Sequence, residues 1–389
     1  MDVHSDSDRT RLCASAQHPS ASTHGDEMHR APYALSSGTK PHAATARRYA
    51  ALDLGTNNCR LLIAEARRSG FRVVDGFSRI VRLGEQLSRA GRLSDEAMDR
   101  AIVALQICAT KLANSGVSRA RIIATEACRA AANCNEFTSR VYDETGLELE
   151  VVNRETEARL AVAGCAPLVD EDAEGVLLFD IGGGSSEIVW LDLTSRYNLE
   201  GTALVHCIRA WTSLPVGVVS LAERHGGQDV DERVFAAMVE DVSQLLNRVD
   251  SRGVLSKAVA RGGVHLLGTS GTVTTLAGVF LGLKRYDRRQ VDGTWLDHGQ
   301  VDVLIAQLLG MSYDDRVANP CIGADRADLV LAGCAILEAI RRRWPCERLR
   351  VADRGLREGM LMELIETDRL AQQRSRRERR VAGRQHAHA

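Results

Sequence analysis

The spacing of hydrophobic residues changes repeatedly along this chain, between short apolar runs typical of strands and three- and four-residue spacing typical of helices. The first half shows, in order, a strand–turn–strand pattern at 48–65, a strand at 71–83, a helix capped by Ser94, a strand at 121–125, a helix at 129–142 and a strand at 148–152. The second half shows a helix at 154–163 capped by Asn153, strands at 176–181, 187–193 and 203–210, a helix at 231–249 and a strand at 264–267. Strands that alternate with helices in this way predict an α/β fold with mixed sheets.

The same pattern divides the chain into four segments. Residues 1–45 lack periodicity and predict a disordered N-terminal arm. Two domains follow, at 46–153 and 154–366, with an exposed acidic turn at 170–174 early in the second. Residues 367–389 are rich in arginine and poor in apolar residues, which predicts a basic tail or a frayed helix.

One loop sequence occurs twice, at Asp53–Arg60 and at Asp180–Glu187, and each copy follows an apolar strand and precedes another. Aspartate aligns with aspartate and glycine with glycine, while Arg60 aligns with Glu187. A strand that ends in a carboxylate and turns through glycine brings backbone N–H groups and one acid to a single point, which suits a metal-bound phosphate. The repeat therefore predicts a duplicated fold that closes on a phosphorylated ligand.

Three loops supply candidate phosphate ligands. The first and second loops contribute Asp53, Gly55, Thr56, Asn57, Asn58 and Arg60, and Gly182, Gly183, Gly184 and Ser185. A third glycine loop contributes Gly268, Thr269 and Ser270. Asp180 and Glu187 bracket the second loop and are candidate ligands of one Mg²⁺ ion, whereas a plain hairpin turn is the alternative interpretation of these glycines. No lysine completes a Walker motif, which disfavours a P-loop NTPase.

Two further side chains are candidates because of their position in the predicted fold. Glu157 lies in the first turn of the helix at the domain boundary, where acids also simply stabilise the helix dipole, but a carboxylate between two phosphate loops is suited to polarise water. Arg129 follows a strand, at the edge where ligands of α/β sheets bind, although an arginine in this position more often pairs with an acid.

Composition narrows the class of protein. The 389 residues are 44% hydrophobic and 26% charged, with a net charge of −1, so no global field attracts nucleic acid or a membrane surface. The sequence contains no signal-peptide pattern and no bilayer-length apolar run. Ten cysteines without a C-x-x-C pair or zinc spacing fit free thiols in a reducing compartment, which predicts a cytoplasmic protein.

Seven segments carry a resemblance to the exopolyphosphatase and guanosine pentaphosphate phosphohydrolase (Ppx/GppA) family, which is a branch of the sugar kinase, heat-shock ATPase and actin superfamily. They are Asp53-Leu-Gly-Thr-Asn57, Thr125-Glu-Ala-Cys-Arg129, Glu155-Thr-Glu157-Ala-Arg159, Asp180-Ile-Gly-Gly-Gly-Ser185, Ser213-Leu-Pro-Val-Gly217, Gly268-Thr-Ser-Gly-Thr272 and Gly355-Leu-Arg-Glu-Gly359. The resemblance covers about residues 48–365. It implies two ribonuclease-H-like domains around a cleft, without the helical metal-phosphohydrolase-like domain that longer relatives append.

The resemblance also implies roles for the candidate residues. Glu157 would be the catalytic base, Asp180 and Glu187 would hold the divalent cation, the loops at Asp53 and Gly182 would cradle the terminal phosphates, and Arg129 would grip an inner phosphate. The sequence departs from the family at Asn153-Arg154, where Ser-Gly is common, and at Asn58, where serine is common. Homodimers are common in the family, so a homodimer is a possible state of this chain.

The expected activity is Mg²⁺-dependent release of orthophosphate from inorganic polyphosphate, from guanosine pentaphosphate, or from both. The residues leave both substrates open. They also leave open phosphotransfer from polyphosphate to a nucleotide, and binding of an alarmone or polyphosphate without turnover.

Overall fold

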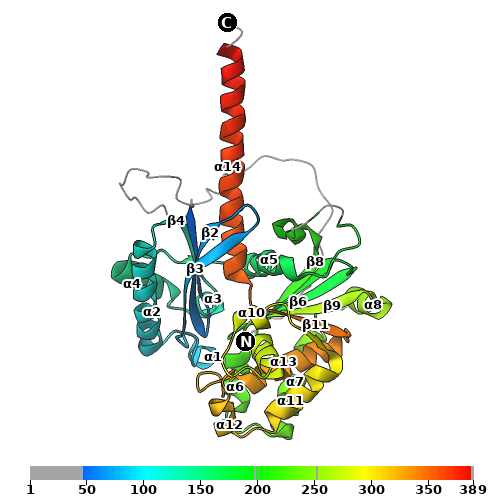
Figure 1. Cartoon of the computed structure of the whole chain (residues 1–389). Coiled ribbons are helices and arrows are strands. Elements are labelled where there is room, and N and C mark those ends of the chain that lie inside the picture. Colours follow the sequence, from blue (N-terminus) through cyan, green and yellow to red (C-terminus); the bar gives the residue numbers. More distant parts are fainter. Residues whose placement is uncertain (1–46, 197–198, 200, 251–252, 387–389) are drawn as a thin grey trace, which may run out of the picture.

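The computed structural model describes residues 47–196, 199, 201–250 and 253–386, with side chains described up to residue 378. The predicted disordered arm at 1–45 lies outside these residues. Figure 1 shows two α/β halves side by side, with one long C-terminal helix running up between them.

The first half is built on a five-stranded sheet of order β3-β2-β1-β4-β5. Its strands are β1 (Arg48–Leu54), β2 (Asn58–Ala66), β3 (Phe71–Ile80), β4 (Val117–Ala124) and β5 (Glu150–Val151). Its helices are α1 (Leu87–Ala90), α2 (Asp95–Asn114), α3 (Glu126–Ala130) and α4 (Cys134–Thr145). The side chain of Ser94 accepts a hydrogen bond from the Ala97 N–H, so the predicted cap of α2 is confirmed.

The second half is built on a six-stranded sheet of order β10-β11-β9-β6-β7-β8. Its strands are β6 (Gly175–Ile181), β7 (Ser186–Asp192), β8 (Ile208–Leu214), β9 (Val264–Thr269), β10 (Trp295–Asp297) and β11 (Arg348–Ala352). Its helices are α6 (Val218–His225), α7 (Glu232–Leu246), α8 (Val254–Arg261), α9 (Gly271–Phe280), α10 (Arg288–Val291), α11 (His298–Leu309), α12 (Tyr313–Ala318) and α13 (Val330–Arg343). Helices α5 (Arg154–Cys165) and α14 (Leu356–His386) lie between the halves, and 3₁₀ turns cover Ala166–Leu168 and Gly201–Cys207.

Strand order supports the duplication that the repeated loop predicts. Three antiparallel strands open each sheet, β3-β2-β1 in one and β8-β7-β6 in the other. Each set then continues into parallel partners, β4 and β5 in the first sheet and β9 and β11 in the second. The predicted α/β fold with two related sheets is therefore confirmed.

Two local predictions differ from the structure, and for the basic C-terminal segment the structure selects the helix from the two predicted alternatives. Most of the strand expected at 203–210 is the 3₁₀ turn, because β8 begins only at Ile208. The helix expected at 129–142 is divided into α3 and α4, since Ala131 adopts an extended conformation between them. The basic segment expected from residue 367 continues α14 without a break to His386, which fits the high helix propensity of arginine, glutamine and glutamate.

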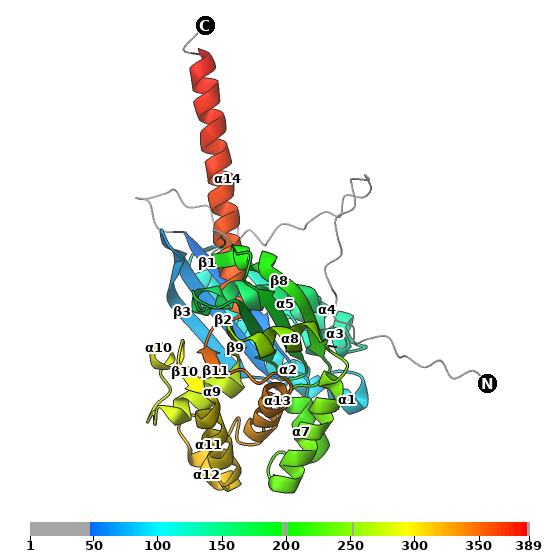
Figure 2. The same ribbon diagram turned by 90° about the vertical axis from the view of Figure 1, so that its right-hand side faces the viewer.

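Helices α5 and α14 approach each other closely because glycine lies at their contact. A Cβ atom on Gly359 would lie 2.1 Å from the carbonyl oxygen of Leu160, and one on Gly164 would lie 2.0 Å from the carbonyl oxygen of Gly355. Farther along α14, Asp368 accepts a 2.9 Å hydrogen bond from the Tyr49 hydroxyl and pairs with Arg119. The C-terminal helix therefore joins α5 to the first sheet. In both views the helix then projects away from the body (Figures 1 and 2).

Gly359→Ala is expected to lower the free energy of unfolding by about 3 kcal/mol, because the added methyl group overlaps backbone that cannot move aside cheaply. Thermal unfolding measures the effect. Gly310→Ala is the matched control, since a Cβ atom there meets nothing closer than 3.5 Å. A Gly359→Ala protein as stable as this control would show that the two helices are packed less tightly than described.

Candidate active site

The two repeated loops have the same geometry. In each, the N–H of the first glycine donates to a carbonyl three residues on, from Gly55 to Asn58 at 2.8 Å and from Gly182 to Ser185 at 2.9 Å. Strand register pairs Asp53 with Arg60 and Asp180 with Glu187. Each turn therefore carries an acid at the end of its first strand, and a charged residue stands directly opposite on the second.

These loops meet across a cavity that is open to solvent. A Cβ atom on Gly183 would lie 2.9 Å from the Thr56 Cβ, and one on Gly184 would lie 2.9 Å from the Thr56 hydroxyl oxygen. Glycine is required here because the two backbones approach so closely. The predicted members of both loops that line the cavity are Asp53, Gly55, Thr56, Asn57, Asn58, Arg60, Asp180, Gly182, Gly183, Gly184, Ser185 and Glu187.

Asp53, Glu157, Asp180 and Glu187 line this cavity, and their environments raise their pKa values. Burial, followed by the neighbouring Glu187 and Asp53, raises the pKa of Asp180 to about 7. Burial also raises the pKa of Asp53 and that of Glu187. The pKa of Glu157 is held well above its usual value by burial and by Glu187, against the opposing effect of Arg129. The site therefore concentrates negative charge where water is largely excluded.

Glu157 reaches the cavity from the first turn of α5, and Asn153 caps this helix as predicted, accepting a 2.8 Å hydrogen bond from the Thr156 N–H. The Glu157 side chain is 9% exposed, and its Oε2 lies 2.7 Å from Arg129 Nη2. That contact is an ion pair without hydrogen-bond alignment, so Oε2 accepts no hydrogen bond within the described part of the chain. Asn57 Oδ1, also buried at the cavity, likewise has no partner there. Buried oxygens of this kind are satisfied by a water or a ligand.

Glu187 is fixed in place by hydroxyl groups. The Ser185 and Ser213 hydroxyls both donate to Glu187 Oε1, each at 2.8 Å. Ser213 opens the Ser213-Leu-Pro-Val-Gly217 segment at the end of β8 and lies opposite Glu187 in the sheet. This segment therefore positions an acid of the second loop.

The positions of the third loop and of Arg129 only partly match their predicted role as phosphate ligands. Ser270 lines the cavity with φ at 87°, a strained conformation that concentrates at ligand sites. Gly268 instead lies against Phe179, and the Thr269 hydroxyl donates to the Arg354 carbonyl. These two residues therefore hold the loop in place and do not line the cavity. Arg129 does not line the cavity, because its guanidinium group is held by the carboxylates and the carbonyl group around it.

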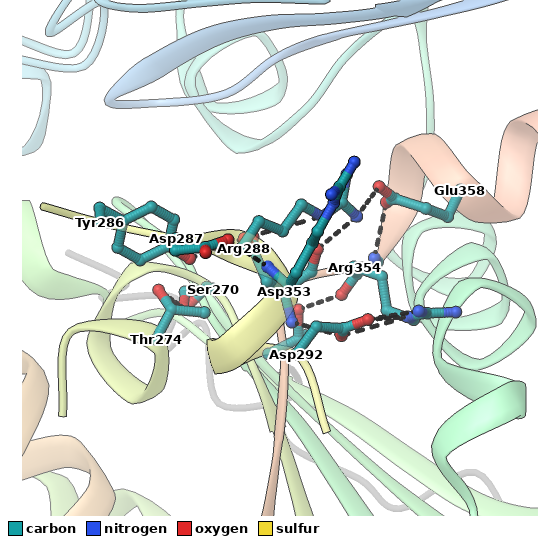
Figure 3. Close-up of polar contacts among 12 residues, drawn as sticks. Ser270, Thr274, Tyr286, Asp287, Arg288, Asp292, Asp353, Arg354 and Glu358 are labelled. Carbon is teal, nitrogen blue, oxygen red and sulfur yellow. Dashed lines mark hydrogen bonds and ion pairs between the residues drawn. The ribbon is translucent and has the colours of Figure 1, made fainter. Parts of the chain in front are cut away.

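A charged cluster beneath the third loop fixes the start of α14 (Figure 3). Arg288 pairs with Glu358 at 2.6 Å, and Arg354 pairs with Asp292. The Glu358 carboxylate also accepts a 2.9 Å hydrogen bond from the Gly355 N–H. The cluster therefore holds the Gly355-Leu-Arg-Glu-Gly359 segment, and Leu356 within it lines the cavity.

Sequence reasoning missed several residues at the cavity. Arg326 lines it from the loop before α13, and Glu126 lines it from the start of α3. Arg326 lies outside every glycine loop and repeated segment, so no local signal pointed to it. Glu126 stands beside Arg129 in a segment that was singled out only for its arginine.

The fold and the facing loops define a class of two-domain α/β proteins whose cleft suits a phosphorylated ligand. Residues 62–368 match the model of the Ppx/GppA phosphatase family, and the chain belongs to that family. Exopolyphosphatase 2 of Mycobacterium tuberculosis (strain H37Rv) is 28% identical over 334 residues, which are 82% of this chain and 98% of that protein.

Solved structures agree with this assignment. The Aquifex aeolicus member of the Ppx/GppA family is 29% identical with a TM-score of 0.66, over 83% of this chain and 99% of that one. A protein described as exopolyphosphatase-like is 28% identical with a TM-score of 0.72, over 82% and 99% of the two chains.

Asp180→Asn is expected to stabilise the metal-free protein at pH 8 by about 1–3 kcal/mol. The raised pKa of Asp180 means that the folded state binds more protons than the unfolded state between about pH 4 and 7, so wild-type stability falls as the pH rises through this window. Unfolding in EDTA at pH 8 and at pH 5 measures the difference, which should be clearly smaller at pH 5, where the window of falling stability has only begun.

Asp172→Asn serves as the control for this prediction, because Asp172 is exposed. It should leave stability unchanged at both pH values. An Asp180→Asn protein that is less stable than wild type at pH 8 would contradict the account of crowded buried acids.

Proposed function

We propose that this protein is an exopolyphosphatase, which hydrolyses the terminal phosphoanhydride bond of inorganic polyphosphate and releases orthophosphate. The observation that carries the proposal is the position of Glu157, a buried carboxylate that lies against Arg129 at a cavity between two glycine loops. Membership of the Ppx/GppA family and the name of the mycobacterial relative support the substrate class.

In this proposal Glu157 is the general base. Burial and the neighbouring Glu187 raise the pKa of Glu157 well above its usual value, which makes its carboxylate a stronger base towards water. The N–H groups of both loops and the Arg60 side chain would bind the phosphate oxygens, on either side of the bond that breaks. Asn57, whose side-chain oxygen has no partner in the described structure, would orient water or a metal-bound ligand.

A divalent cation, Mg²⁺ in this proposal, would be held by Asp180 and the free Glu187 oxygen. Burial raises the pKa values of both acids, and Glu187 further raises that of Asp180, so a cation beside them would lower the cost of ionising them. Within the described residues, no group of three or more acid, histidine or cysteine side chains could hold a metal ion by itself. This fits Mg²⁺, which is usually bound by one or two carboxylates together with waters and substrate phosphates. When bound, the ion would neutralise charge on the phosphates.

Guanosine pentaphosphate is the second candidate substrate, because it presents the same terminal phosphoanhydride. Polyphosphate is favoured because the names of the relatives given above refer to it. Phosphotransfer to a nucleotide is a distinct alternative. Adding ADP to the assay would reveal it by the formation of ATP.

In the described residues no helix is long and apolar enough to cross a bilayer, and the nine described cysteines are free. Free thiols support a cytoplasmic location, and a homodimer is a further part of the proposal.

Purified protein with Mg²⁺ is expected to release orthophosphate from long-chain polyphosphate faster than from guanosine pentaphosphate at matched concentration. EDTA should abolish the release, because the acids at the second loop repel both one another and the substrate without a cation. Colorimetric phosphate measurement checks both points. Release from guanosine pentaphosphate alone would identify that alarmone as the substrate in place of polyphosphate. Release from neither would overturn the proposal.

Glu157→Gln is expected to lower kcat by about 10² to 10⁴, because the amide cannot accept the proton of the attacking water. Polyphosphate binding should remain near wild type. Glu155→Gln is the matched control, since Glu155 belongs to the same helical turn but is exposed. Wild-type turnover by Glu157→Gln would exclude Glu157 as the base.

A further inference from the structure

Arg129 is surrounded by partners on all sides of its guanidinium group. Its Nε and Nη2 donate to Glu126 Oε2 at 3.1 and 2.9 Å, and its Nη1 donates to the Val152 carbonyl at 2.8 Å. Nη2 also lies 2.7 Å from Glu157 Oε2. Every nitrogen of this arginine is therefore engaged within the protein.

Glu126 is the centre of this network. Its Oε2 receives Arg129, while its Oε1 accepts a 2.8 Å hydrogen bond from Arg154 Nη2. Two carboxylates and two guanidinium groups thus alternate in one chain, Arg154–Glu126–Arg129–Glu157, and their charges balance. Such a network restricts each member more than an isolated ion pair would.

The network joins separate elements of the fold at the cavity. Glu126 and Arg129 belong to α3 of the first half, whereas Arg154 and Glu157 belong to the first turn of α5. Glu126 lines the cavity, and a Cβ atom on Gly184 of the second loop would lie 3.3 Å from its Cγ. Within this network the Arg154 side chain is the most exposed, at 38%, and the Glu157 side chain is the most buried, at 9% exposed.

We propose that Glu126 is a positioning residue for hydrolysis: it holds Arg129 against Glu157, and so fixes the orientation of the base and keeps the guanidinium group from the substrate phosphates. This inference rests on the proposed function. Arg154, which stands where the family commonly has glycine, orients the Glu126 carboxylate from the other side. The predicted role of Arg129 as a phosphate ligand is thereby replaced by an indirect one.

Removal of the Glu126 charge distinguishes a positioning role of Glu126 from a purely structural one. In Glu126→Gln the side chain keeps its shape, but Arg129 loses the partner that holds two of its nitrogens. Because misplacement of a catalytic group by about 1 Å costs up to about 100-fold in rate, kcat on polyphosphate is expected to fall about 10- to 100-fold. KM should stay within about twofold of wild type, since neither residue contacts the phosphates in this account.

Two further variants complete the experiment. Glu126→Asp retains the carboxylate and should recover kcat to within about tenfold of wild type, although it is one methylene shorter. Glu155→Gln removes an exposed acid from the same turn of α5 and should leave both constants unchanged. Thermal unfolding of all variants shows whether kcat follows stability. A purely structural ion pair would lower the unfolding temperature at unchanged kcat, and this outcome would overturn the inference.

Other outcomes also overturn it. A Glu126→Gln protein with unchanged kcat and lower KM would show that Arg129, once released, binds phosphate directly and that Glu126 competes with the substrate. Equal loss in Glu126→Gln and Glu126→Asp, with full loss of the folded state in both, would assign Glu126 to folding alone. Failure of the wild-type protein to hydrolyse polyphosphate is a separate result, since it would remove the proposed function and leave the network described above as a structural contact.

Discussion

Five carboxyl groups line one partly enclosed cavity, and the rest of the site is arranged around the cost of keeping them there. Burial raises the pKa values of Asp53, Asp180, Glu187 and Glu157, and neighbouring acids in the cavity further raise those of Asp180 and Glu157. Two serine hydroxyls anchor Glu187, and Arg129 stands against Glu157. Such a concentration of acids weakens the folded protein and suits a site that is completed by a cation and phosphate, so that stability is given up for function.

Duplication explains how the chain brings these acids together. Each sheet contributes one β-hairpin whose first strand ends in aspartate, and the two turns touch through Thr56, Gly183 and Gly184. Contacts outside the two loops support this approach. Glycines at the crossing of α5 and α14 let the two helices pack backbone to backbone, and the charged cluster at Arg288 and Arg354 fixes where α14 begins. A small error at either contact would separate the loops.

Much of this could be predicted from the sequence, because the decisive signals are local. The strand–glycine–strand pattern fixed the two hairpins, and side-chain caps at Ser94 and Asn153 marked two helix starts. The rest depends on contacts distant in sequence. Arg129 lies 28 residues from Glu157 along the chain and is held by it only in the folded state, and Arg326 reaches the cavity from a loop without a motif. Helix α14 continues past residue 366, the predicted end of the second domain, because its residues favour a helix even though the apolar spacing ends there.

The most direct test of the central claim is proton release when Mg²⁺ binds in the presence of sulfate, a phosphate analogue that carries no titrating proton between pH 7 and 9. Asp180, whose pKa is raised to about 7 by burial and by the neighbouring Glu187 and Asp53, must lose its proton when a cation lies beside it. Titration calorimetry at pH 7 in buffers of different ionisation enthalpy should therefore give heats that differ with the buffer. This dependence should disappear at pH 9, where Asp180 is already ionised. Identical heats in every buffer at pH 7 would contradict the account.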